Sequence, residues 1–577
     1  MRHIVAGNAV SIIGLLSVLS LSSFAVPVLA SQAPPVPDAG SIFRDQKSML
    51  PQFPQLPARE KAIELPAKSE SGVLVAVKGF KFSGYEGAAT EAELQALGAD
   101  IKGKSISFEE LKALADKITA YLREKGWFRA RAYLPKQDVT SGIIEIAVLQ
   151  GASDGRLEFK LDKTARISQS VLHSIGETAV RKGAPVNEHD LERSVLIMND
   201  LPGVIARASL APGTLPGTTG VEVAVSEGPI LSGLIWGDNY GNRYTGSWRG
   251  NTMISINDPF CYGDQITALM NEADGLVQGR IGYSAPVFLP GLRGSLSYTG
   301  MSYEIGADRA YLAATGSSNN VDAGLSYSLI RSRTRNLTTS LTYGYKSLVD
   351  KTAGPAYYDK QLNSVTLNVN GDRYDQLWGG GASSYSIGVT TGHLNESKNA
   401  SYYFTGKEGQ YTRFNFALAR LQRLSEEVNF NLSGVAQMSL DNLGSSEQFS
   451  LGGPNAVRAY PVGEAPGDEG QLITADIRYN IPLATSTRSI QIDGFYDAGH
   501  ITLNRDRYAG DVFNDTSRNT YWLQGAGVGL NFLFSQKGAL QCSWAHVIGS
   551  NPGQYQGKNA DGRAEKSRFW LHGELYF

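Results

Sequence analysis

Residues 567–577 read SRFWLHGELYF and are the most informative stretch of the chain. An extended strand places successive side chains on opposite faces. One face of this stretch carries Phe569, Leu571, Gly573, Leu575 and Phe577, and the other carries Arg568, Trp570, His572, Glu574 and Tyr576. This alternation, ending on an aromatic residue, is typical of a barrel strand with lipid on one side and water on the other. A half-buried strand of a soluble sheet would fit equally well, so the rest of the chain decides.

The amino terminus predicts export. Arg2 and His3 precede an apolar run that ends in Val28-Leu29-Ala30 before Ser31, which is the order of a signal peptide spanning residues 1–30. Ser and Gly interrupt the run, whereas a membrane anchor needs ~20 strongly apolar residues. An exported chain without a helical anchor can still cross a membrane as a closed barrel.

Composition narrows the function classes. The chain has 64 Gly and 27 Tyr but only 2 Cys, and its net charge of -2 gives no support for a nucleic-acid partner. Cys261 and Cys542 lie far apart, so neither a metal site nor a disulfide framework is indicated. We expect no metal and no cofactor.

Residues 31–71 predict a short helix on an extended tether. Within 38–50, Ile42, Phe43, Met49 and Leu50 share one helical face. Prolines at positions 51, 54, 57 and 66 prevent the helix from continuing.

Two tandem α/β modules follow, over residues 72–151 and 152–229. In the first, a strand over 73–82 precedes a helix that begins at Ser107, where Glu110 completes a capping box. Two more strands end the module. The second module repeats this order with a strand at 156–161, helices near 168–175 and 187–199, and two final strands.

Residues 230–577 predict a β-barrel of about sixteen strands. The run VNFNLSGVAQMSL at 428–440 alternates apolar and polar side chains, as barrel strands do. Short breaks alternate with long ones, and short turns at one end with long loops at the other are the outer-membrane arrangement. The long breaks lie near 305–319, 394–404, 441–470, 503–519 and 550–566.

The longest loop, 441–470, places Arg458 in a glycine-rich setting. A later strand, DGFYDAGHI, carries Asp497. An arginine on a loop folded into the lumen could bind a wall carboxylate through two parallel hydrogen bonds. Residue chemistry alone equally allows a solvated loop arginine, since most arginines are exposed.

The chain resembles the outer-membrane transporters of two-partner secretion, the TpsB family that exports haemolysins and filamentous adhesins. The resemblance covers nearly all of the mature chain. It rests on the VRAY motif at 457–460, the FYDAG motif at 495–499, the paired modules and the terminal Phe577. The modules resemble polypeptide-transport-associated (POTRA) domains at Phe80, Phe82, Gly84, Gly126, Pro135, Gly142, Leu201, Pro202, Gly203, Pro212 and Gly213. The barrel entry resembles family sequence at Asn239, Gly241, Thr245, Gly246, Arg249 and Asp264.

The resemblance implies a mainly β protein: a sixteen-stranded outer-membrane barrel plugged by the amino-terminal helix and the infolded loop, with both POTRA domains in the periplasm. It assigns Arg458 and Asp497 as a loop-to-wall salt bridge and Phe577 as a carboxy-terminal assembly signal. The infolded motif is Val457, Arg458, Ala459 and Tyr460, and the wall motif includes Phe495, Asp497 and Gly499. One departure is Ala459, where many family members have glycine.

The implied partners are a secreted TpsA-type exoprotein, outer-membrane lipid and lipopolysaccharide, and the barrel assembly machinery during biogenesis. An unfolded client could pair with a free POTRA strand edge. The main rival is a BamA-type assembly factor, which would carry a longer POTRA array. A passive porin would have no reason to carry two modules, and a barrel enzyme would need clustered catalytic residues. Gly525, Gly527 and Gly529 mimic a nucleotide-binding loop, but close packing on a strand is the ordinary explanation.

Overall fold

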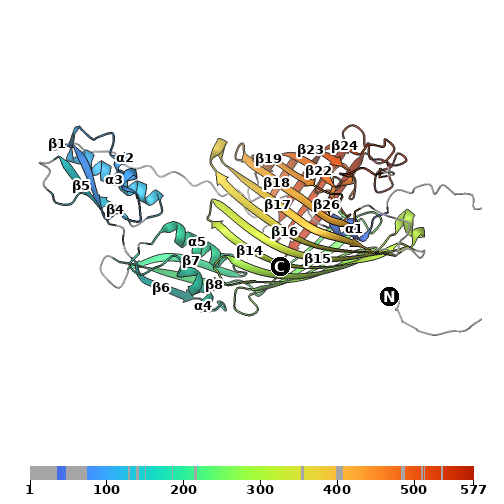
Figure 1. The fold of residues 1–577 in the computed structure, drawn as a ribbon, viewed down its shortest axis with the longest axis horizontal. Coiled ribbons are helices and arrows are strands. Elements are labelled where there is room, and N and C mark those ends of the chain that lie inside the picture. The colour runs from blue at the N-terminus through green and yellow to red at the C-terminus, as the bar shows by residue number, and fades with distance from the viewer. Residues whose placement is uncertain are drawn as a thin grey trace, which may run out of the picture. The chain divides into compact units, whose positions relative to one another are not determined.

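Sixteen antiparallel strands close into a barrel in the computed structural model of the chain (Figure 1). The structure describes residues 36–46 and 74–577, apart from 128–129, 138–141, 150, 152, 185, 213–217, 353–356, 398–406, 483–487, 509–510, 513 and 535–536. The predicted signal peptide, the proline-rich tether and Gly213 therefore lie outside the described residues. None of the helices in the described part has the length and apolarity needed to span a bilayer.

Each barrel strand pairs with its neighbours in sequence order, and β26 returns to β9 to close the cylinder. Closure leaves no unpaired strand edge in the wall, which is the condition for a sheet to span a bilayer. The strands are β9 (Leu231–Asp238), β10 (Arg249–Asn257), β11 (Gln265–Ala273), β12 (Leu276–Pro286), β13 (Leu292–Glu304), β14 (Thr315–Arg331), β15 (Arg335–Lys351), β16 (Tyr357–Asp375), β17 (Gly381–Glu396), β18 (Gly409–Arg423), β19 (Val428–Ser439), β22 (Glu469–Ile481), β23 (Arg488–Thr502), β24 (Thr520–Phe534), β25 (Gly538–Val547) and β26 (Ser567–Tyr576).

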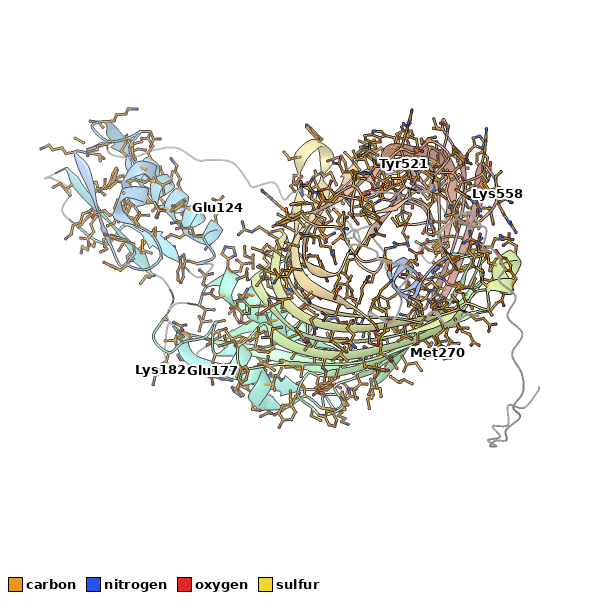
Figure 2. The ribbon with its side chains drawn as sticks, turned by 45° about the vertical axis from the view of Figure 1, so that its right-hand side comes forward. Glu124, Glu177, Lys182, Met270, Tyr521 and Lys558 are labelled. Carbon is orange, nitrogen blue, oxygen red and sulfur yellow. The ribbon has the colours of Figure 1, made fainter. Side chains whose placement is uncertain are left out.

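Side chains of the wall alternate between an apolar outer face and a polar lumen. In β19, Leu432 and Met438 are 44% and 55% exposed, whereas Asn431 and Gln437 are buried. Met270, labelled in Figure 2, is one of the outward-facing residues. The period-two pattern of the sequence thus separates a lipid-facing from a lumen-facing surface.

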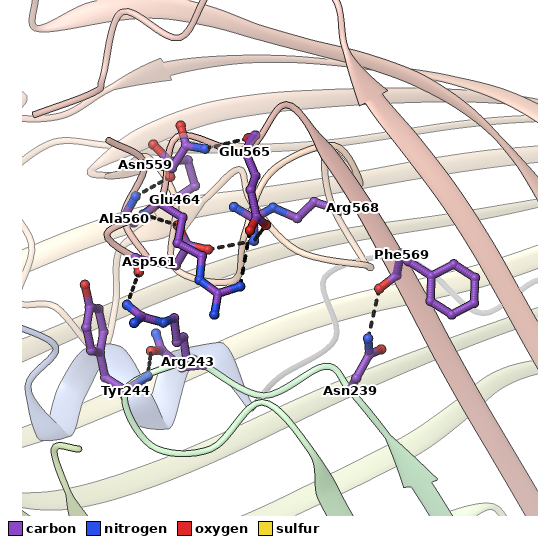
Figure 3. Close-up of polar contacts among 12 residues, drawn as sticks. Asn239, Arg243, Tyr244, Glu464, Asn559, Ala560, Asp561, Glu565, Arg568 and Phe569 are labelled. Carbon is purple, nitrogen blue, oxygen red and sulfur yellow. Dashed lines mark hydrogen bonds and ion pairs between the residues drawn. The ribbon is translucent and has the colours of Figure 1, made fainter. Parts of the chain in front are cut away.

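The closing pair β26–β9 is short, running from His572–Asp238 to Tyr576–Leu234. Beyond β9, the Asn239 side chain continues the pairing: its Nδ2 donates to the Phe569 carbonyl at 2.8 Å, and the Leu571 N–H donates to its Oδ1 at 2.8 Å (Figure 3). At the other end, the Phe577 N–H donates to the Gly233 carbonyl at 3.0 Å.

β9 follows the second module, so the barrel has a near end on the module side and a far end. The long connections lie at the far end and include 239–248, 305–314, 440–468, 503–519 and 548–566. They contain the 3₁₀ helix η1 (Ala307–Leu312) and the two-residue strands β20 (Phe449–Ser450) and β21 (Pro466–Gly467). At the near end, η2 (Leu377–Gly379) lies in a short turn.

Each module has a three-stranded sheet whose last strand lies in the centre, parallel to the first strand and antiparallel to the second. Two helices lie between the first and second strands of each sheet, and the first module adds a separate two-stranded pair. The first contains β1 (Leu74–Ala76), β2 (Gly79–Ser83), α2 (Glu91–Leu97), β3 (Ser105–Ser107), α3 (Phe108–Glu124), β4 (Arg131–Tyr133) and β5 (Ile143–Leu149). The second contains β6 (Ser153–Leu161), α4 (Gln169–Gly176), α5 (Glu188–Asn199), β7 (Val204–Pro212) and β8 (Thr219–Glu227).

The first module differs in detail from the sequence expectation. The single strand predicted over 73–82 is two strands in two sheets, because Val77 N–H bonds to the Lys104 carbonyl while Lys78 N–H bonds to the Gly142 carbonyl. Helix α3 begins where it was expected, with the Ser107–Glu110 capping box in place. The module boundaries 72–151 and 152–229 stay predictions.

Candidate functional site

The far-end loop 440–468, which we call the infolded loop, turns back into the barrel. Val457, Ala459 and Tyr460 at its tip are fully buried against wall residues that include Leu523. Backbone hydrogen bonds from Val457 N–H to Leu451 O and from Tyr460 N–H to Val457 O fold the tip on itself. The β20–β21 pair ties the two limbs together.

Arg458 binds two wall carboxylates. Its Nε donates to Asp497 Oδ2 at 2.8 Å and its NH2 to Asp497 Oδ1 at 2.7 Å, which is a bidentate pair with β23. NH2 also donates to Asp476 Oδ1 on β22 at 2.9 Å. Asp497 is fully buried behind this contact. Asp497 was predicted from the sequence, whereas Asp476 was not.

Two aromatic side chains fix the same arginine. The guanidinium carbon of Arg458 lies 3.3 Å from the centre of the Phe495 ring, a stacked cation–π contact. Trp570 Nε1 on β26 donates to the Arg458 carbonyl at 2.7 Å. Residues of three strands, β22, β23 and β26, therefore hold one loop residue.

Glycines in the wall make room for the infolded loop. A Cβ on Gly499 would lie 2.4 Å from Leu451 Cδ2, and one on Gly525 would lie 2.5 Å from the Cβ of Ala459. Ala459, the departure from the family pattern, thus fits because its wall neighbour has no side chain. Close packing is what Gly525 contributes.

The loop has a second anchor, at which the loop supplies the carboxylate and the wall supplies the basic side chains. Glu447, on the ascending limb, is 3% exposed and pairs with Lys346 of β15 and with Arg413 of β18, whose NH2 lies 3.0 Å from Oε2. In the barrel order, one strand separates β18 from β22, and four strands separate β15 from β22. The loop is therefore pinned at two separate places on the wall. Sequence reasoning missed Glu447, since strand register was needed to find its partners.

Helix α1 (Ala39–Asp45) lies inside the barrel (Figure 1), where Ile42 and Phe43 pack against lumen residues that include Leu348. Residues 47–50, the second half of the predicted helix, lie outside the described residues. Asp38 caps the helix by accepting from the Ser41 N–H at 2.8 Å.

Wall residues bind the first turn of α1. Lys360 Nζ lies 2.9 Å from Asp38 Oδ2, and the Ala39 N–H donates to Asp350 Oδ1 at 2.7 Å. Burial alone would raise the pKa of Asp38, but the charge of Lys360 and the Ser445 hydroxyl outweigh it and hold that pKa well below its usual range. Asp38 is thus a fixed anionic cap.

The helix and the infolded loop contact each other directly. Ser445 Oγ donates to Asp38 Oδ2 at 2.6 Å, and Arg44 donates to the Ser445 carbonyl at 3.3 Å. A Cβ on Gly40 would lie 2.3 Å from Ser445 Oγ, so only glycine permits this approach. The two elements form one interlocked plug.

A polar cavity of about 840 Å³ remains between α1, the loop tip and the wall. Arg44, Asp45, Arg249, Arg458 and Arg478 are among its lining residues. Within the described residues, no cluster of His, Cys, Asp and Glu has a geometry that could hold a metal ion. The arrangement is suited to obstructing a water-filled pore.

Comparison with known proteins identifies relatives of the whole architecture. Residues 217–532 match the model of the haemolysin secretion/activation protein ShlB/FhaC/HecB family, and residues 75–151 match the ShlB-type POTRA domain. The heme/hemopexin transporter protein HuxB of Haemophilus influenzae is 27% identical over 477 residues, covering 81% of each chain. The outer membrane transporter CdiB of Dickeya dadantii is 22% identical over 429 residues, covering 70% of this chain and 73% of CdiB.

Solved structures share the fold. CdiB from Escherichia coli has a TM-score of 0.70 at 19% identity, with 89% of this chain and 93% of CdiB covered. BamA from Haemophilus ducreyi, lacking POTRA domains 1–3, has a TM-score of 0.52 at 13% identity, with 88% and 100% covered. The barrel fold is thus common to CdiB and BamA. The family model that this chain matches is that of ShlB/FhaC/HecB.

Proposed function

The chain belongs to the haemolysin secretion/activation protein ShlB/FhaC/HecB family, and we propose that α1 and the infolded loop together control its pore. Members of this family are outer-membrane transporters of two-partner secretion, so the barrel lies in the outer membrane and the POTRA domains in the periplasm. The near end of the barrel therefore faces the periplasm and the far end faces outside. The assembly-factor alternative has only the shared fold in its favour.

The exporter takes a secreted TpsA-type exoprotein as its client. The name heme/hemopexin transporter protein describes HuxB and is not carried over to the client of this chain. We propose that the client reaches the POTRA domains unfolded and pairs with a free strand edge such as β6, because backbone pairing needs little side-chain specificity. The family is one of transporters, and we propose that the chain has no catalytic activity.

The single observation that carries the proposal is the interlocked plug. Arg458 and Glu447 hold the loop to different parts of the wall, and Asp38 joins the helix to both the wall and the loop. A folded plug blocks passive flow, and its polar anchors can exchange for water when a client enters. Folding of the client outside would then supply the direction of transport.

We further propose roles for the outer surface and the terminus. The apolar belt meets outer-membrane lipid and lipopolysaccharide. Phe577, whose ring packs over the Cα of Gly233 beside the closing strand pair, is the signal read by the barrel assembly machinery.

The proposal is tested by co-expressing this chain with a candidate TpsA-type exoprotein. The client should appear in the medium only when the transporter is present, while other outer-membrane proteins should assemble normally without it. Defective assembly of unrelated barrels on loss of this chain would favour the assembly-factor reading instead.

A further inference from the structure

Glu464 lies on the return limb of the infolded loop and is 2% exposed. Its carboxylate bonds outside its own loop: Asn551 Nδ2 donates to Oε1 at 2.7 Å, and the Ala560 N–H donates to Oε2 at 2.6 Å (Figure 3). Both donors belong to 548–566, the last outer loop. One side chain therefore joins two loops that are far apart in sequence.

The last outer loop is folded around this carboxylate. The Asn551 Oδ1 accepts from the Gly553 N–H at 2.9 Å, which fixes the amide so that Nδ2 faces Glu464 and Asn559. The Asn559 Nδ2 donates to the Glu565 carbonyl at 3.1 Å. Both donors to Glu464 are thus held in place by contacts within their own loop.

The same loop reaches the first outer loop, 239–248. Arg243 NH1 donates to the Asp561 carbonyl at 2.8 Å and pairs with Asp308 at 3.0 Å (Figure 3). A Cβ on Gly562 would lie 2.7 Å from the hydroxyl of the buried Tyr244. Loop 548–566 consequently connects the infolded loop with the loops around 239–248 and 305–314.

No basic side chain of the described residues lies within ion-pair distance of Glu464. Arg568 of β26 instead pairs with Asp561 at 2.6 Å and with Glu565 at 3.5 Å. The charged and titratable groups facing Glu464 are Asp561, Arg568, Tyr460 and Tyr521. A buried carboxylate with only neutral donors costs free energy that an ordinary structural contact would avoid.

We propose that Glu464 is a positioning residue that latches the infolded loop to the last outer loop, and that this latch must open for export. The inference rests on the proposed function and extends it to the outer mouth of the pore. Arg458 and Glu447 hold the loop to the wall, whereas Glu464 holds it to another loop. Release at Glu464 would free the return limb without breaking either wall anchor.

Burial raises the pKa of Glu464 to about 7, although the Ala560 N–H and the Asn551 amide oppose the shift. In the open state the pKa would return to its ordinary value near 4.5. The closed latch then binds a proton that the open latch releases between these two values. Lowering the pH through this window favours the closed latch, by up to about tenfold per pH unit.

The test is single-channel recording of the purified full chain in planar bilayers at pH 5.5 and pH 8 on the outer side. Wild type should open less often at pH 5.5 than at pH 8. Glu464→Gln, which cannot titrate there, should lose most of this difference. Glu408→Gln makes the same change at an exposed carboxyl near the outer end of β18 and should keep it.

Asn551→Ala supplies a second variant that leaves the carboxyl in place. It removes one donor and should raise the opening frequency at pH 8 severalfold, as expected for a lost buried hydrogen bond of about 1 kcal/mol or more. A wild-type pH difference in Glu464→Gln, or wild-type opening in Asn551→Ala, would overturn the latch. Single-channel recording needs no client. A wild-type chain that gates as expected but exports no client would therefore contradict the proposed function and not the latch.

Discussion

At the scale of single residues, the infolded loop is held by charges that are paired on the wall. Arg458 contacts two carboxylates, and Asp476 also accepts from the Asn431 amide at 2.7 Å. Removing the arginine leaves Asp497 without a cation and Asp476 with Arg478 alone, whose NH2 lies 3.4 Å from Asp476 Oδ2. Removing Asp497 leaves Arg458 paired with Asp476. The two single substitutions are not equivalent.

We expect Arg458→Ala to impair export strongly while the barrel stays inserted and heat-resistant. Breaking a buried pair on one side costs ~3–5 kcal/mol when fully desolvated, and less in a wet lumen. Asp497→Ala should be milder, and Arg458→Ala/Asp497→Ala should be hardly worse than Arg458→Ala, because one interaction is lost only once. Secreted client from the three variants decides this, and multiplying defects would show that the residues act independently.

Glu447→Gln tests the second wall anchor. The substitution keeps the shape but removes the charge that Lys346 and Arg413 share, so it should loosen the ascending limb and raise channel conductance. Glu426→Gln, at an exposed position in the turn after β18, is the matched control. Equal conductance in wild type and Glu447→Gln would show that the tip anchor alone holds the loop.

Whether the partners of a site residue can be predicted from the sequence depends on whether the strand register is known. A family resemblance was enough to name Arg458 and Asp497. Asp476 also carries a sequence signal, since it shares a strand face with Arg478 directly after the loop. The partners of Glu447 and Glu464 are set by how loops fold across distant strands, and a period-two pattern contains no such information.

At the scale of elements, the strand pattern was the strongest signal. Apolar and polar side chains alternate over long strands, so sixteen strands could be counted from the sequence and the structure confirms them. The seven-residue helix α2 was missed, although Thr90 and Glu93 form a capping box at its start. The position of α1 inside the barrel was expected from the family resemblance and not from the sequence pattern, because a helix on a tether is located only by its contacts.

Removing residues 31–50 tests the helix as part of the plug. The variant loses the Asp38–Lys360 pair and the contact with Ser445, so single-channel conductance should rise while the barrel remains folded. Gly40→Val keeps the helix sequence otherwise intact and should act in the same direction, since its side chain would overlap Ser445. Gln52→Ala, in the tether, is the control. Unchanged conductance in both variants would mean that α1 is not the plug.

At the scale of the whole molecule, the hydrogen-bond networks of the barrel and of the first module are separate. Strands β2, β4 and β5 form their own sheet, the first module has its own apolar core, and no described strand of it pairs with the barrel. A closed barrel satisfies its backbone polar groups without help from outside the wall. Folding of the barrel and recognition of the client are therefore separable.

Deleting residues 73–151 should leave a folded, inserted barrel and abolish export. The barrel should keep its heat-modifiable migration and its resting conductance, because both depend on the wall, the infolded loop and α1. The free edges of the first module's sheet would be gone, and with them one surface on which an unfolded client can add a strand. Client at wild-type levels in the medium from the deletion would exclude a recognition role for this module, whereas loss of the barrel itself would show that the two parts do not fold independently.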